Sequence, residues 1–141
     1  MPGKAAGGLD FNHAMLYTQD VPAALAFYRD LLGFKTVDIF EWQGRPVYAR
    51  LKAPRGTGTL ALHMPAPGES VPASDGVRLY FEIQELEKFC AKLEAAGVVI
   101  KKPPKLMPWG WVHAYLDDPD GHEISLYWAG VKRFRKTKLK T

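Results

Sequence analysis

The sequence repeats itself at a spacing of 65 residues. Residues 13–21 (HAMLYTQDV) align with residues 78–86 (RLYFEIQEL), and residues 47–56 (VYARLKAPRG) align with residues 112–121 (VHAYLDDPDG) at the same offset. Chance matches would not share one register. The chain is therefore expected to hold two copies of one supersecondary unit, and such repeats usually do not bury their cores alone. A ligand site between the copies is the natural expectation.

Length and composition restrict the class of protein. The chain has 141 residues, of which 47% are hydrophobic and 24% charged, as in ordinary globular proteins. No apolar run approaches the roughly 20 residues that cross a bilayer, so we expect no membrane association. The first residues lack the apolar stretch of a secretory signal, and Cys90 has no cysteine to pair with. These features predict a cytoplasmic protein.

The positive charge is concentrated at the C-terminus. The net charge is +4, but six of the 19 basic residues lie in residues 131–141. Residues 1–130 hold 13 basic and 15 acidic residues, a net charge of −2. A basic tail can attract phosphate backbones. Because the rest of the chain is not basic and shows no nucleic-acid motif, we expect no nucleic-acid binding apart from this tail.

Hydrophobic periodicity and turn residues predict one βαβββ pattern in each copy. In the first, residues 11–17 form a strand, Asp20 caps a helix that Gly33 ends, and residues 35–42, 46–52 and 59–64 form strands. In the second, residues 77–83 form a strand, a helix ends before Gly97, and residues 98–102, 111–116 and 123–128 form strands. The predicted organisation is a flexible leader (1–9), a first module (10–64), a linker (65–76), a second module (77–128) and a basic tail (129–141).

Alternation along the strands separates two rows of side chains. The apolar row, which suits packing against the helices, contains Ala14, Leu16, Leu60, Leu62, Leu79, Phe81, Ile83, Ile124 and Leu126. The opposite row contains His13, Met15, Tyr17, Tyr48, Arg50, Ala61, His63, Arg78, Tyr80, Glu82, Trp111, His113, Tyr115, Glu123, Ser125 and Tyr127. Its histidines and aromatic rings indicate a concave binding surface, the alternative being a solvated outer sheet face.

Four features together resemble the vicinal oxygen chelate superfamily of glyoxalase I, fosfomycin-resistance enzymes, bleomycin-resistance proteins and extradiol dioxygenases. They are the paired units, a strand histidine seven residues before Asp20, the segment FYRDLLGF at 27–34, and DPDGH at 118–122. The likeness covers roughly residues 10–128. It implies an α+β fold of two tandem βαβββ modules that form curved mixed sheets around a cleft. It also implies a homodimer, and often a divalent metal that chelates vicinal oxygens of the substrate.

The superfamily's metal positions can be transferred one at a time. The first strand of the first module supplies His13, but the equivalent position in the second module is Arg78, which cannot donate a lone pair. The last strands supply Ser125 and Ala61. We therefore expect no cofactor. The alternative is one divalent ion (Fe, Zn, Mn or Ni) in a displaced centre with His13, His63 and Glu123 as ligands and His113 as a further candidate.

Two functions from different classes follow. The first is a protein that binds a small organic molecule by stacking and hydrogen bonds, as the bleomycin-resistance branch does, through Tyr17, Tyr48, Arg50, His63, Tyr80, Trp109, Trp111, His113, Tyr115, Ser125 and Tyr127. For Trp109, ordinary packing at a strand start is an equal alternative. The second is a lyase, isomerase or dioxygenase acting on a vicinal dioxygen substrate. There His13 or Glu123 would be the general base, and Arg78 or a displaced metal the electrophile.

Overall fold

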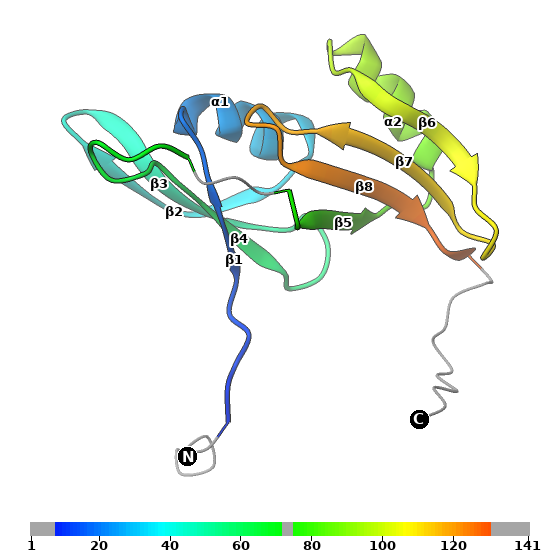
Figure 1. Cartoon of the computed structure of the whole chain (residues 1–141), viewed down its shortest axis with the longest axis horizontal. Coiled ribbons are helices and arrows are strands. Elements are labelled where there is room, and N and C mark those ends of the chain that lie inside the picture. Colours follow the sequence, from blue (N-terminus) through cyan, green and yellow to red (C-terminus); the bar gives the residue numbers. More distant parts are fainter. Residues whose placement is uncertain (1–7, 72–74, 131–141) are drawn as a thin grey trace. The chain divides into compact units, whose positions relative to one another are not determined.

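The chain divides into two compact units, Met1–Pro72 and Ala73–Thr141. The computed structural model describes residues 8–71 and 75–130. Most of the expected leader, the centre of the expected linker and nearly all of the basic tail lie outside the described residues. Within the described ranges, each unit consists of a four-stranded sheet and one helical segment (Figure 1).

The first unit has the element order βαβββ. It contains β1 (Ala14–Tyr17), α1 (Val21–Leu25), the π-helical turn η2 (Ala26–Leu31), β2 (Lys35–Trp42), β3 (Arg45–Lys52) and β4 (Thr59–His63). The strands lie in the order β1-β4-β3-β2. β1 runs parallel to β4, and the other neighbours are antiparallel, so the sheet is mixed.

The second unit repeats this arrangement. It contains β5 (Arg78–Glu82), α2 (Leu86–Ala95), β6 (Ile100–Leu106), β7 (Val112–Asp117) and β8 (Glu123–Trp128), with strand order β5-β8-β7-β6. Again the first strand pairs in parallel with the last, and the rest are antiparallel. The predicted fold of two tandem βαβββ units with curved mixed sheets is confirmed.

Capping residues fix where the helices begin and end. Asp20 accepts a hydrogen bond from the Ala23 N–H at 3.1 Å, as expected for an N-cap. Gly97, with φ +96°, ends α2. Its N–H donates to the Glu94 carbonyl at 2.9 Å, and the Val98 N–H donates to the Leu93 carbonyl at 3.0 Å, which satisfies two terminal carbonyls. Neither described helix is long and apolar enough to cross a membrane.

The first helix differs from the prediction. It is α-helical only to Leu25 and continues as the π-helical turn η2, in which Phe27 and Tyr28 are both buried. Their rings meet edge to face with centroids 5.0 Å apart. A π turn inserts one residue into the helical repeat. The 3.6-residue periodicity of the sequence could not predict this π turn. The turn lets the adjacent residues Phe27 and Tyr28 both pack into the core, which is a tertiary effect.

Some strand limits also differ. β1 begins at Ala14 rather than at residue 11, and Phe11 is exposed. β6 extends through Pro103 and Pro104, where the prediction ended at residue 102. Prolines are tolerated there because β6 is an edge strand with irregular register to β7.

The predicted helix-facing row supplies much of the core. Leu16, Leu60, Leu62, Ile124 and Leu126 are all buried. The opposite row is less open than predicted, because Ala61, His113 and Ser125 are buried as well. In the second unit, His113 is buried because large aromatic side chains surround it on that face. The opposite row is therefore partly buried, rather than solvated along its whole length.

Candidate functional site

In the first unit, His13 and Arg50 meet across the sheet. The Arg50 Nη2 lies 3.3 Å from the His13 Nε2, and the Arg50 Nε donates to the Tyr48 hydroxyl at 3.2 Å. The His13 Nδ1 lies 2.6 Å from the Asn12 Oδ1. Since guanidinium only donates and the amide oxygen only accepts, both contacts fit a neutral His13 with its proton on Nδ1. Both ring nitrogens are therefore engaged.

His63 lies further along the same sheet. Its ring centroid is 6.0 Å from that of Tyr17 and 5.6 Å from that of Tyr48, and its Nδ1 contacts the Met64 carbonyl oxygen. His63 is in register with Tyr17, which follows His13 by four residues. Four residues along a strand span about 13 Å. His13 and His63 are thus far apart along the strands of one sheet, and the third expected ligand, Glu123, belongs to the other unit.

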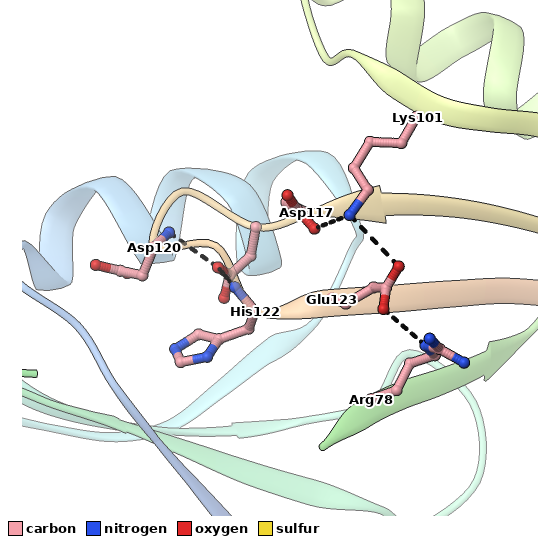
Figure 2. A network of polar contacts seen from close by, with 7 residues as sticks. Arg78, Lys101, Asp117, Asp120, His122 and Glu123 are labelled. Carbon is pink, nitrogen blue, oxygen red and sulfur yellow. Dashed lines mark hydrogen bonds and ion pairs between the residues drawn. The ribbon is translucent and has the colours of Figure 1, made fainter. Parts of the chain in front are cut away.

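In the second unit, four charged side chains form a continuous ion-pair network across the sheet (Figure 2). The Arg78 Nε of β5 donates to the Glu123 Oε1 of β8 at 2.8 Å. The Lys101 Nζ of β6 lies 3.4 Å from the other carboxylate oxygen of Glu123 and 2.9 Å from the Asp117 Oδ1 of β7. All four strands contribute one residue each. We call Arg78, Glu123, Lys101 and Asp117 the ion-pair network.

These contacts shift the pKa values of the network. The hydrogen bond from Arg78, followed by that from Lys101, holds the pKa of Glu123 below its ordinary value against the opposing effect of burial. The pKa of Arg78 is raised, first by a hydrogen bond with Tyr80 and then by Glu123. Glu123 is therefore a firmly ionised carboxylate with both oxygens next to cations, which makes it a weak proton acceptor.

The centre of the same sheet is a cluster of aromatic rings around His113. The rings with centroids near that of His113 are Tyr127 at 5.5 Å, Trp109 at 5.6 Å, Tyr80 and Tyr115 at 5.9 Å, and Trp111 at 6.2 Å. Trp111 also lies nearly parallel to Tyr127, at 5.3 Å and 13°. We call these six residues the His113 cluster. It brings together most of the ligand-binding residues that the sequence predicts in the second unit.

A buried polar pair stands within this cluster. The His113 Nδ1 lies 2.8 Å from the Ser125 Oγ, and the two residues are 3% and 0% exposed. The other ring nitrogen, Nε2, is buried and is the one such side-chain atom in the described residues that lacks a hydrogen-bond partner. Burial, followed by the charge of Arg78, lowers the pKa of His113 below its ordinary value. The imidazole is therefore neutral at pH 7.

Two cations flank one ring at the margin of the cluster. The Arg78 Cζ is 5.2 Å from the Tyr115 ring centroid, and the Lys102 Nζ is 5.5 Å from it. Both are within the range of cation–π attraction. Arg78 and Tyr115 were predicted from the sequence as site residues, whereas Lys101, Lys102 and Asp117 were not. The irregular register of edge strand β6, which sets where these lysines point, has no local sequence signal.

The residues at the superfamily's metal positions do not form a suitable donor set. Arg78 is a cation and Ala61 has no donor atom. The Ser125 hydroxyl is fully buried and bonded to His113, and the His13 Nε2 faces Arg50. These four positions therefore do not fit a tightly bound divalent ion.

A different group of potential ligands lies in the turn before β8. Asp118, Asp120 and His122 have ligand atoms within 4.8 Å of one another, the one such group of three in the described part of the chain. The Asp118 Oδ1 accepts hydrogen bonds from the N–H groups of Asp120 and His122, each at 2.9 Å. This carboxylate closes the turn. Figure 2 shows the His122 ring directed away from Glu123, so the turn is separate from the ion-pair network.

Comparison with known proteins agrees with this architecture. The family model described as the glyoxalase/bleomycin resistance protein/dioxygenase superfamily matches residues 10–126. The chain belongs to this superfamily. The match covers β1 to β8 apart from the last two residues of β8, and therefore both βαβββ units. No curated protein sequence matches this glyoxalase-superfamily chain significantly.

Solved structures of other proteins share this fold. A member from Sphaerobacter thermophilus is 25% identical, with a TM-score of 0.69 over 85% of this chain and 98% of that one. A lactoylglutathione lyase from Agrobacterium tumefaciens is 22% identical, with a TM-score of 0.65 over 86% and 95%. TioX from Micromonospora sp. ML1 is 19% identical, with a TM-score of 0.68 over 85% and 98%. The latter two likenesses concern the fold alone.

Proposed function

We propose that this superfamily member binds a small planar organic molecule by stacking and hydrogen bonding, without a metal at the superfamily's ligand positions. The observation that carries the proposal is the His113 cluster, in which Trp111 and Tyr127 lie nearly parallel at 5.3 Å next to a buried neutral histidine. Flat rings of this kind offer large contact area and lose little side-chain entropy on binding.

The charges beside the cluster support an electron-rich ligand. Arg78 and Lys102 both lie against Tyr115, and Arg78 keeps 43% of its side chain exposed. A cation next to an aromatic surface attracts enolate, phenolate or carboxylate oxygens. In the first unit, Arg50, Tyr48, His63 and Tyr17 form a group of similar composition. Both units thus present the side-chain types that the proposal needs.

The enzyme alternative receives no comparable support from the described residues. A general base at Glu123 would need a basic carboxylate, but Arg78 and Lys101 hold its pKa low. His13 has both ring nitrogens engaged. A lyase, isomerase or dioxygenase activity remains a prediction, which turnover lost in both His13→Ala and Glu123→Gln would support.

Calorimetric titration with a panel of planar aromatic and antibiotic-like compounds, in the presence of a chelator, tests the binding proposal. We expect at least one compound to bind, and Trp111→Ala to weaken its binding by roughly tenfold, since a stacked ring is worth about 1–3 kcal/mol. Trp42→Ala is the matched control, because Trp42 is an exposed tryptophan of edge strand β2. Binding that needs a divalent ion, or equal losses in both variants, would contradict the proposal.

Two further expectations belong to this proposal. The superfamily's usual dimerisation leads us to expect a homodimer, with the modules either paired within one chain or exchanged between two. A monomeric mass at micromolar concentration would contradict that. A cytoplasmic location is likewise expected, which a fluorescent fusion of the full chain would test.

A further inference from the structure

The Nε2 of His113 is buried and has no hydrogen-bond partner among the residues that the structure describes. A buried polar atom without a hydrogen bond destabilises a protein by about the desolvation penalty of the group, and such atoms are rare. The His113 ring is fixed on its other side by Ser125 at 2.8 Å and is enclosed by five aromatic rings. The atom is therefore held ready for a partner that arrives with the ligand.

We infer that the Nε2 of His113 is the hydrogen-bonding group of the ligand site and that it takes an uncharged hydroxyl group carried on a planar ring. This inference rests on the proposed function and names the ligand chemistry of the same site. His113 is thereby the residue that selects among rings, while Trp111 and Tyr127 supply stacking area that most rings could use.

The choice of an uncharged hydroxyl follows from the surroundings of Nε2. The Ser125 hydroxyl can either donate to or accept from Nδ1, so Nε2 can be an acceptor or a donor. A hydroxyl group satisfies both cases. A ligand ammonium group would be repelled by Arg78 and Lys102, which flank Tyr115. A ligand carboxylate would pair with Arg78 and Lys102 at the margin of the cluster. At Nε2, among the rings, it would lose its hydration, and the neutral imidazole offers it no opposite charge.

Access to Nε2 requires that one ring of the cluster moves. Trp109 and Tyr80 meet His113 edge on, and they are 50% and 51% exposed. Tyr80 also packs against Tyr127, with ring centroids 5.9 Å apart. The hairpin that carries Trp109 is fixed by two backbone bonds of 2.8 Å, from Gly110 to Met107 and from Met107 to Trp111. Rotation of the Trp109 side chain on a rigid turn is thus the simplest opening.

The test compares 2-naphthol with 2-methylnaphthalene, which has nearly the same size but no hydrogen-bonding group. Affinities are measured calorimetrically on the full chain at pH 7 with chelator present. Wild type should prefer 2-naphthol over 2-methylnaphthalene, and His113→Phe should reduce this preference by about tenfold, the usual effect of one hydrogen bond to a buried group. The affinity of the His113→Phe variant for 2-methylnaphthalene should stay within about twofold of wild type.

A second variant and a second measurement guard against misfolding. His113→Phe leaves the Ser125 hydroxyl without its partner, so the double variant His113→Phe with Ser125→Ala is tested in parallel. In wild type, the ring ¹⁵N signals of His113 should shift at Nε2 with 2-naphthol and not with 2-methylnaphthalene. Trp109→Ala should speed the association of both compounds several-fold, while Trp42→Ala leaves the rates unchanged.

The outcomes separate the inference from the proposed function. Equal affinity ratios in wild type and the histidine variants, or no shift at Nε2, overturn the inference while ring binding itself stands. Binding of other planar compounds without preference for a hydroxyl would likewise overturn the inference and leave the proposed function standing. If no planar compound binds wild type, the proposed function fails and the inference fails with it.

Discussion

The Nε of Arg78 donates to the Oε1 of Glu123 at 2.8 Å, across the parallel pair of β5 and β8. Arg78 stands where resemblance to the superfamily implies a metal ligand. A guanidinium offers no lone pair at neutral pH. In this position the charge of Glu123 is balanced by side chains of the protein rather than by a divalent cation.

This ion pair predicts that the protein retains no stoichiometric metal. After incubation with excess Fe²⁺, Zn²⁺, Mn²⁺ or Ni²⁺ and gel filtration, metal analysis of untagged protein should find far less than one equivalent per chain. Close to one equivalent in wild type, lost in His13→Ala, would overturn this prediction and point to the displaced centre.

The ion-pair network predicts how stability responds to acid. The pKa of Glu123 is lowered in the folded protein, so its contribution is present above the unfolded value of about 4.3 and is lost as the pH falls through the lower folded pKa. Glu123→Gln should reduce the free energy of unfolding at pH 7 by about 0.5–1 kcal/mol, since the pair is partly exposed. In denaturant titrations, the difference in free energy of unfolding between wild type and Glu123→Gln should be smaller at pH 3 than at pH 7.

Glu85→Gln is the matched control for that measurement. Glu85 pairs with Lys88 at 3.5 Å, but both side chains are largely exposed. Its substitution should change the free energy of unfolding by less than about 0.5 kcal/mol at either pH. Equal effects of the two substitutions would show that the network adds nothing beyond a surface charge.

The buried histidine predicts a second pH dependence at higher pH. The pKa of His113 is lowered in the folded protein, so below the ordinary value of 6.5 the unfolded chain takes up a proton that the folded chain does not. The free energy of unfolding should therefore fall between pH 7 and pH 5. His113→Phe should show a shallower slope over this interval in denaturant titrations. An unchanged slope would contradict a neutral buried His113.

The contact between His113 and Ser125 predicts a specific loss of stability. Ser125→Ala leaves the His113 Nδ1 buried without its partner at 2.8 Å, and should lower the free energy of unfolding by about 1–3 kcal/mol. The exposed Ser70 provides the control, with an expected change below about 0.5 kcal/mol for Ser70→Ala. Thermal or denaturant unfolding measures both, and a negligible loss in Ser125→Ala would show that this contact does not stabilise the fold.

The C-terminus of α2 predicts a backbone effect. Gly97 has φ +96° and open space around the position of an added Cβ, so Gly97→Ala introduces backbone strain alone. We expect it to destabilise the protein by about 1 kcal/mol. Gly76→Ala, where no left-handed φ is required, should be nearly neutral or slightly stabilising. Equal stability of the two variants would argue against the capping role of Gly97.

Much of the fold could be predicted because its signals are local. The N-cap Asp20 and the stop at Gly97 depend on residues within a few positions of each other, and β2 and β8 have the predicted limits. The 65-residue repeat is found by aligning the chain with itself. Alternation along the strands also identified the row that holds most of the His113 cluster. The predicted limits of β1 and β6 were wrong, because they depend on which residues pair with β4 and β7, and the register of β6 to β7 is irregular.

The sequence by itself thus determined that two βαβββ units form and which side chains share a sheet face, because capping, turns and strand alternation are short-range effects. Only the tertiary structure decided how those side chains meet. Register brings Arg78 beside Glu123, 45 residues later, and His113 beside Ser125, 12 residues later. Charge pairing, burial and pKa depend on distances between strands, and no local pattern encodes those distances.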